Sequence, residues 1–313
     1  ELLGVIRTQE LIEARKIDGG EQLFSRANDF GFSKNPTETL AIWDKEKVLA
    51  DVVWAIRKFQ PDVIINRFDH RSPGTTHGHH TASAMLSVES FNLTNNPSVY
   101  PEQLKYVQPW QAKRQFFNTS WWFYGSQEKF NAADKTNLIA MQTGVYYPNI
   151  GKSNQEIAAL SRSSHQSQGF GSTGTRGEET EYLEFLNGER VPTNGSLFDG
   201  IDTSWNRVKG GKAIGELLNL ISKEFNHNNP SASMTKRVKA YQMTLQLDEN
   251  HWSKQKAAET KKIIAACAGL YLEAVAPTQE TTPGSSLKLK IEAINRSTIP
   301  MVLKSVTTLP NQN

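Results

Sequence analysis

The sequence is poor in several features that mark common classes of protein. Its 313 residues include a single cysteine, Cys267, so no disulfide can form within the chain. Small apolar neighbours predict that this thiol is buried in a core. No apolar run approaches the length that spans a lipid bilayer, and we therefore expect no transmembrane segment in this chain.

Neither sign of charge dominates the sequence. The 35 lysines and arginines nearly balance the 32 aspartates and glutamates, and the basic residues are scattered along the chain. Proteins that bind nucleic acid usually concentrate lysine and arginine in a patch or stripe. The sequence therefore gives no reason to expect a nucleic-acid partner.

The spacing of apolar residues predicts an α/β fold in the first part of the chain. Apolar residues recur at helical spacing over 2–17 and 46–60, and another helix is expected to begin near residue 79. Between the last two, the short apolar run 62–66 predicts a strand buried on both faces, as in a parallel sheet. This order predicts a Rossmann-like, mostly parallel sheet flanked by helices.

The remainder of the chain shows a different sequence pattern. Residues 208–277 contain two helix-forming stretches, and 278–286 is a linker-like break. Residues 287–295 alternate apolar and polar side chains, which predicts a half-buried antiparallel strand. We therefore expect an α/β domain over 1–207, a helical segment over 208–277, and over 278–313 a linker followed by the first strands of a β-sandwich-like domain.

Four of the seven histidines lie close together, at positions 70, 77, 79 and 80. They follow the predicted strand 62–66, and the carboxyl ends of strands are where α/β sheets bind ligands. Because imidazole is a common zinc ligand, the cluster predicts a metal site. Three alternatives remain open: His77 and His79 pair on extended backbone, His77 and His80 pair on a turn or helix, or no metal binds.

The first alternative is typical of metallo-β-lactamase-like hydrolases. That family continues its His-x-His pattern with Asp-His, whereas this chain has Thr81 and Ala82. We keep such a hydrolase as a minor alternative, which two bound metals per chain would favour.

Several stretches, in order along the chain, resemble the PIG-L/LmbE-like zinc de-N-acetylases. The stretches are RTQELIEARKIDGG (7–20), RANDFGFS (26–33), RKFQPDVIINRF (57–68), HGHHTAS (77–83) and EIAALSRSSHQSQGFG (156–171). The resemblance implies an LmbE-like α/β fold. It also implies hydrolysis of an N-acetyl group from an N-acetylglucosamine-type sugar or glycoconjugate, with one Zn²⁺ as cofactor.

The resemblance also implies roles for individual residues. His80 would be a zinc ligand, and His77 would act on the substrate carbonyl. The residues implied to bind substrate are Arg7, Asp29 and His165. Those expected to support the site are Glu10, which would orient Arg7, Asp69, which would hold the other nitrogen of His80, and His79. By contrast, we expect Trp121 and Trp122 to pack in the core or between domains rather than to face a sugar.

One part of the family pattern is missing. The Ala-His-Pro-Asp-Asp-Glu motif, which supplies the other zinc ligands and the general base, does not occur in these 313 residues. We expect the motif to precede residue 1 in a longer polypeptide, and residues 1–313 alone to bind zinc poorly.

The alternative is a non-catalytic carbohydrate-binding or scaffold protein. The tail resembles larger Bacteroidetes members, which suggests a secreted or periplasmic protein. The oligomeric state stays open.

Overall fold

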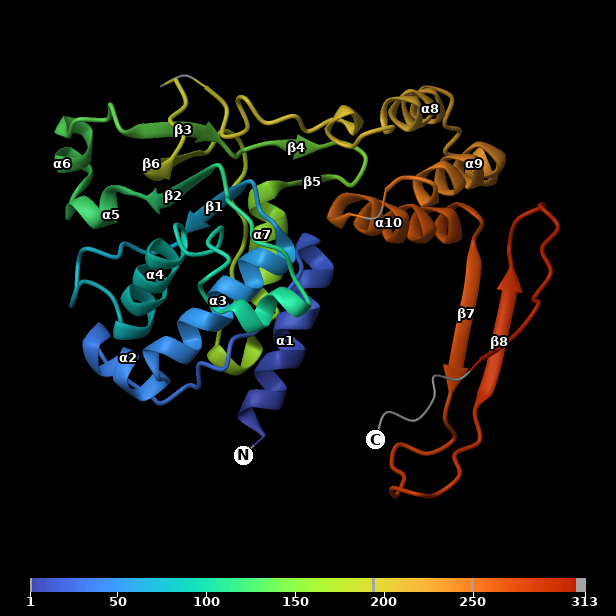
Figure 1. Cartoon of the computed structure of the whole chain (residues 1–313), viewed down its shortest axis with the longest axis horizontal. Coiled ribbons are helices and arrows are strands. Elements are labelled where there is room, and N and C mark those ends of the chain that lie inside the picture. Colours follow the sequence, from blue (N-terminus) through green and yellow to red (C-terminus); the bar gives the residue numbers. More distant parts are fainter. Residues whose placement is uncertain (1, 193–194, 249, 308–313) are drawn as a thin grey trace. The chain divides into compact units, whose positions relative to one another are not determined.

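The chain divides into two units, Glu1–Ile201 and Asp202–Asn313, in a computed structural model that describes residues 2–192, 195–248 and 250–307 (Figure 1). The first unit contains a sheet of strand order β1-β2-β6-β3. Its strands are β1 (Val63–Asn66), β2 (Arg114–Thr119), β3 (Leu138–Gln142) and β6 (Thr180–Gly188). β1 and β2 are parallel, whereas β6 runs antiparallel to both β2 and β3. The sheet is thus mixed, and helices flank it in an α/β arrangement.

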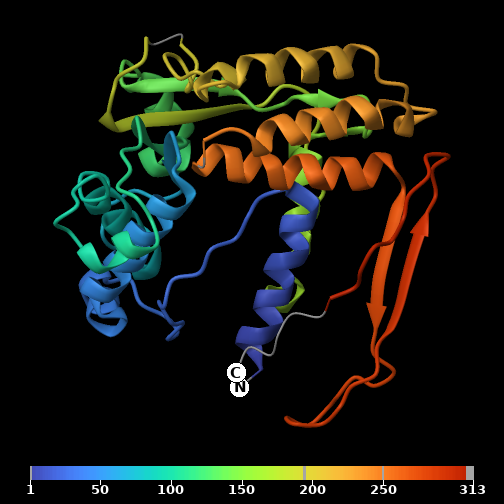
Figure 2. The ribbon, with the colours of Figure 1, turned by 45° about the vertical axis from the view of Figure 1, so that its right-hand side comes forward.

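Helices of the first unit form two groups. One group packs α2 (Pro36–Trp43) and α3 (Lys45–Phe59) against α4 (Gly78–Ser90). In the other, α1 (Leu3–Asp18) lies beside α7 (Asn154–Ser163), as Figures 1 and 2 show. The helices predicted over 2–17, over 46–60 and from about 79 are confirmed. The shorter elements are η1 (Pro101–Lys105), α5 (Trp121–Tyr124), α6 (Gln127–Ala132), β4 (Tyr146–Tyr147), β5 (Lys152–Ser153) and η2 (Gln166–Gln168).

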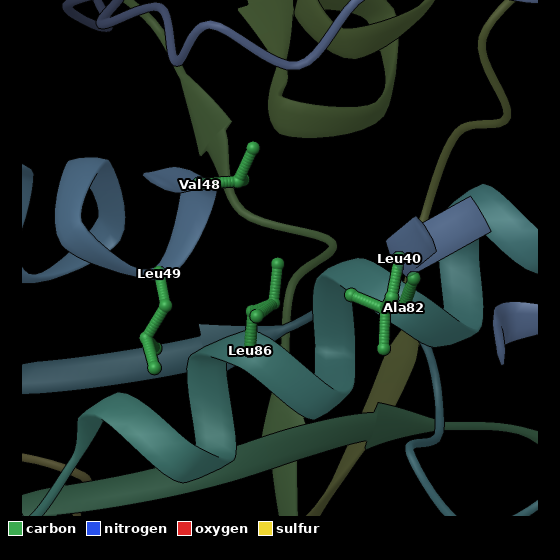
Figure 3. Close-up of a cluster of buried hydrophobic side chains, with 5 residues drawn as sticks. All are labelled: Leu40, Val48, Leu49, Ala82 and Leu86. Atoms are coloured by element: carbon green, nitrogen blue, oxygen red, sulfur yellow. The ribbon is translucent and has the colours of Figure 1, made fainter. Parts of the chain in front are cut away.

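One apolar core joins α2, α3 and α4. Its buried members are Leu40, Val48, Leu49, Ala82 and Leu86 (Figure 3). Ala82 and Leu86 are four residues apart and therefore share one face of α4. Full burial of a leucine side chain contributes about 1.5–3 kcal/mol to folding. This cluster fixes α4, which carries the histidines, against the rest of the unit.

Strand β1 departs from its predicted burial. Its side chain Ile65 is 48% exposed, although the sequence predicted a strand buried on both faces. The face that carries Asn66 is covered by α4, where the Ser87 hydroxyl donates to Asn66 Oδ1 at 2.6 Å. Among the described strands, only β2 pairs with β1, so the other long edge of β1 is open. Ile65 instead faces a cavity of about 620 Å³ that Met141 and Leu183 also line.

The second unit is helical and ends in a strand pair. Its elements are η3 (Trp205–Arg207), α8 (Lys212–Lys223), η4 (Pro230–Ser233), α9 (Met234–Leu245), α10 (His251–Cys267), β7 (Leu270–Val275) and β8 (Lys290–Asn295). Residues 270–275, predicted to be helical, instead form β7, because α10 ends before Gly269, whose φ of +58° stops a helix. β8 pairs antiparallel with β7 but is exposed along its length rather than half-buried. Cys267 is only partly buried.

The described helices include none that is both long enough and apolar enough to cross a membrane.

A buried arginine holds the connection after α4 in place. The Arg57 guanidinium is fully buried and donates to four backbone carbonyls, those of residues 94, 96, 99 and 100, and to the side chain of Gln103. Burial lowers the pKa of Arg57. The guanidinium nevertheless provides five hydrogen-bond donors in a fixed geometry, which a folded loop of carbonyl groups can satisfy.

We predict that Arg57→Met lowers the free energy of unfolding by at least about 3 kcal/mol, since each buried acceptor left unpaired costs about 1–3 kcal/mol. Denaturant unfolding followed by circular dichroism measures this loss. The matched control is Arg176→Met at an exposed arginine, where a change of about 0.5 kcal/mol or less is expected. An Arg57 variant as stable as this control would contradict the prediction.

Candidate functional site

A cavity of about 390 Å³ lies where β1 and β2 end and α4 begins. Two of the clustered histidines, His77 and His80, line it. The other lining residues are Lys34, Arg67, Phe68, Thr75, Thr76, Ser120, Trp122 and Phe123. Trp121 and Trp122 are each about half exposed, at 49% and 48%, so neither packs in the core of the first unit. We refer to this cavity as the histidine pocket.

The start of α4 brings His77 and His80 together. His77 is the last extended residue before the helix, with ψ 149°, and helical backbone follows from Gly78. Positions three apart lie on one side of a helical turn. The two imidazole rings accordingly face each other at a centroid distance of 5.3 Å and an interplanar angle of 23°.

Gly78 allows α4 to begin directly against the segment before α2. Its backbone N–H donates to the carbonyl of Ser33 at 2.7 Å. A Cβ at this position would lie 2.7 Å from the carbonyl oxygen of Asn35 and 2.6 Å from the hydroxyl of Thr39. Only glycine permits so close an approach. The contact places residue Lys34 at the same pocket as the histidines.

The environment of His80 favours its neutral form. Its ring stacks on Phe68 at a centroid distance of 3.9 Å and an angle of 6°. Burial lowers the pKa of His80, and the neighbouring His77 and His79 lower it further. A neutral imidazole keeps a lone pair, which can bind a metal or accept a hydrogen bond.

His79 lies in different surroundings. Its ring stacks on Phe30 at 4.3 Å and meets the edge of Trp43 at 5.6 Å, and it does not line the histidine pocket. Successive residues of a helix point about 100° apart. His77 and His79 therefore do not share a site, as the His-x-His alternative would require.

Asp69 anchors its own loop instead of His80. Its carboxylate accepts hydrogen bonds from Arg71 Nε at 2.8 Å and from the Ser72 hydroxyl at 2.6 Å. Burial raises the pKa of Asp69, but these bonds outweigh it and the net shift is downward. Arg71 also makes a bidentate pair of hydrogen bonds to the carboxylate of Glu184 in β6, at 2.8 and 2.7 Å. Among the described contacts, none joins Asp69 to His80, so an orienting role for Asp69 stays a prediction.

Two of the residues expected at a sugar site pair with each other. Arg7 Nη1 donates to Asp29 Oδ2 at 3.0 Å, near the surface. Neither side chain lines the histidine pocket. The loop that carries Asp29 still reaches it, because Phe32 meets the edge of the His77 ring at 5.1 Å. This pair thus lies beside the pocket rather than in its wall.

Glu10 of α1 makes a separate contact with Ser167 of η2, two residues after His165. The Glu10 carboxylate accepts from the Ser167 backbone at 2.6 Å and from its hydroxyl at 2.8 Å. Arg7 bonds to Asp29, while its charge still acts on Glu10, so the role of Glu10 in orienting Arg7 stays a prediction. His165 immediately precedes η2 and is not part of the histidine pocket.

The described residues do not form a complete zinc site. No group of three or more histidine, cysteine, aspartate or glutamate side chains is placed to hold a metal ion within residues 2–192, 195–248 and 250–307. A catalytic zinc needs three protein ligands and an open position. The neutral imidazole of His80 suits a single ligand, and Asp69 is engaged by Arg71 and Ser72.

No protein-family model matches the chain, and no curated protein matches its sequence significantly.

We predict that Gly78→Ala destabilises the first unit by about 1–3 kcal/mol, because the new methyl group is forced against backbone that cannot move freely. Gly4→Ala is the matched control, since Gly4 is also helical but has open space around it. The control should gain up to about 1 kcal/mol, as alanine is the better helix former. Thermal unfolding of both variants measures the difference, and a stabilised Gly78 variant would contradict the close approach.

The contact between Glu10 and Ser167 should depend on pH. The Ser167 backbone hydrogen bond lowers the pKa of Glu10 below its ordinary value of 4.5, burial opposes this, and the Ser167 hydroxyl, His165 and Arg7 lower it further. Stabilisation by a carboxyl group with a lowered pKa is present above the ordinary value and is lost as pH falls through the folded value. The Ser167 amide NMR resonance should therefore titrate below pH 4.5. Glu10→Gln should abolish that titration; its persistence in this variant would assign the change to another group.

Proposed function

We propose that the first unit is the larger part of a zinc-dependent de-N-acetylase of the PIG-L/LmbE type. Its substrate would be an N-acetylglucosamine-type sugar or glycoconjugate. The observation that carries the proposal is the facing pair His77 and His80, at the carboxyl end of β1, in a pocket whose wall includes Trp122. The five sequence stretches that resemble this family add support, since three of them meet around the pocket.

The proposed reaction is hydrolysis of an amide. When bound, zinc lowers the pKa of its water to about 7 and so supplies hydroxide at neutral pH. His80 would be one metal ligand, its ring held flat against Phe68. His77 would donate a hydrogen bond to the carbonyl oxygen of the substrate as negative charge develops there. The exposed face of Trp122 offers an apolar surface for a sugar ring.

The proposal needs further zinc ligands and a carboxylate base, which the described residues do not supply. We propose that a His-Pro-Asp-Asp strand of a longer form of the protein provides them by pairing with the open edge of β1. Among the described residues, that edge has the unpaired backbone groups that an added strand uses. The carboxyl end of such a strand, if parallel, would meet the sheet edge that carries the histidine pocket.

A second candidate is a carbohydrate-binding or scaffold protein that keeps this fold without catalysis. The incomplete ligand set among the described residues favours it. A metallo-β-lactamase-like hydrolase has less support, because His79 packs between Phe30 and Trp43 and not beside His77.

Zinc binding tests the proposal. The 313-residue chain should bind zinc only weakly, and a longer form with the His-Pro-Asp-Asp motif should bind one zinc per chain and release acetate from N-acetylglucosamine substrates. In that longer form, His80→Ala should lose stoichiometric zinc. His77→Ala should retain zinc while kcat falls about 10²–10³-fold, the usual effect of removing one hydrogen-bond donor to an oxyanion.

His227→Ala is the matched control, since His227 is an exposed histidine of the second unit. It should leave both zinc content and kcat unchanged. A longer form that lacks the motif, or one that binds zinc equally well without His80, would contradict the enzyme proposal and leave the carbohydrate-binding candidate.

A further inference from the structure

We propose that the second unit carries a binding site for a neutral sugar, in a cavity of about 430 Å³ between η3 and the first turns of α8. Trp205 of η3 lies in its wall, and we refer to it as the Trp205 cavity. Within the described residues, none lines both this cavity and the histidine pocket. The inference therefore goes beyond the proposed catalysis and does not depend on it.

Two glycines bring Trp205 onto α8. A Cβ at Gly215 would lie 2.9 Å from the Cβ of Trp205 and 3.4 Å from its ring atoms Cγ and Cδ1. A Cβ at Gly211, directly before α8, would lie 2.2 Å from the carbonyl oxygen of Trp205. Because glycine has no Cβ, η3 can rest directly on the start of α8. The indole is thereby placed beside this helix.

The short helix η3 is held at both of its ends. Ser204 caps its start, where the hydroxyl accepts from the backbone N–H of Asn206 at 3.2 Å. At its other end, the guanidinium of Arg207 lies over the ring of Trp252 in α10, 4.2 Å from the centroid. A side chain that is ordered before binding loses less conformational entropy when a ligand arrives. Trp205 is therefore a pre-positioned surface.

The helix α8 adds polar side chains to the same cavity. Lys212, Glu216 and Asn219 follow one another at intervals of four and three residues, so they share one face of the helix. All three are exposed and line the Trp205 cavity. The opposite face is buried through Ile214 and Ile221. Burial of that face fixes the direction in which the polar side chains point.

These polar groups have no partner within the protein. In the part of the chain that the structure describes, the side chains of Lys212, Glu216 and Asn219 form no hydrogen bond or ion pair, and the indole N–H of Trp205 donates to no acceptor. One ammonium and one carboxylate leave these groups without net charge, which favours a neutral ligand. The ammonium only donates, the carboxylate only accepts and the amide does both. A sugar hydroxyl, which also does both, can bond to each of them.

The apolar part of the wall favours a sugar over other neutral polar molecules. Trp205 and Leu218 contribute apolar surface beside the polar groups. A pyranose ring with equatorial hydroxyls has flat C–H faces and a rim of hydroxyl groups. Its face can lie on the indole while its rim reaches Glu216 and Asn219. Ligand cavities usually combine apolar surface and a few polar groups in this way, over volumes of about 300–1,000 Å³.

The experiment titrates the 15N-labelled 313-residue chain with cellobiose and follows the indole N–H resonances by NMR. Cellobiose has no N-acetyl group and is therefore no substrate for the proposed catalysis. The chain has seven tryptophans, and each gives one such resonance. The resonance that shifts should be the one that is missing from the Trp205→Phe variant. Tetraglycine, a polar peptide without a pyranose face, should leave it in place.

Glu216→Ala combined with Asn219→Ala should weaken cellobiose binding at least about tenfold, because it removes a hydrogen bond to a charged group. The matched control is Ser222→Ala combined with Lys223→Ala, at two exposed positions of α8 outside the cavity, which should keep the affinity. Circular dichroism should show the same helix content in both double variants, since all four side chains are exposed and alanine favours a helix.

No shift of the Trp205 resonance, an equal response to tetraglycine, or unchanged affinity in the Glu216 and Asn219 variant would overturn the inference. These outcomes leave the de-N-acetylase proposal standing, because zinc binding and acetate release test the histidine pocket. Conversely, a chain that binds cellobiose at Trp205, and whose longer form releases no acetate, supports the inference and refutes the proposed catalysis.

Discussion

The contact between Gly78 and the backbone of Asn35 determines where the histidine pocket forms. With no side chain between them, α4 begins directly on the segment that leads into α2. That approach fixes the rotation and the depth of α4, and so the direction in which His77 and His80 point. It also holds Lys34 at the pocket. The core beneath, formed by Leu40 of α2 and Ala82 of α4, is continuous with this contact.

A second anchor holds the opposite side of the pocket. Arg71 donates hydrogen bonds both to Asp69, near the start of the loop between β1 and α4, and to Glu184 in β6. Glu184 is far away in the sequence. Asp69 and Glu184 are largely buried, and a buried carboxylate is stable only with partners of this kind. The loop between β1 and α4 is therefore tied at both ends. Phe68, within it, is held where it can stack on His80.

Much of the local structure could be predicted from the sequence. The helices α1, α3 and α4 and the strand β1 follow from apolar spacing, since this signal lies within a few neighbouring residues. The pairing of His77 with His80 was one of three alternatives that the spacing of the histidines allowed. The hydrogen-bond partners of Asp69 and Glu10 could not be read from spacing: Asp69 accepts from Arg71 two residues away, and Glu10 accepts from Ser167 across the unit.

The sequence by itself determined which residues are helical, which strand leads to the histidines, and that imidazoles gather at its carboxyl end. Only the tertiary structure decided which imidazoles share a pocket with Lys34, Arg67 and Trp122, and which one packs against Phe30. The physical reason is the distance along the chain over which each effect acts. Backbone geometry and side-chain periodicity act over one or two turns, whereas a pocket is assembled from segments whose proximity depends on the packing of the whole unit.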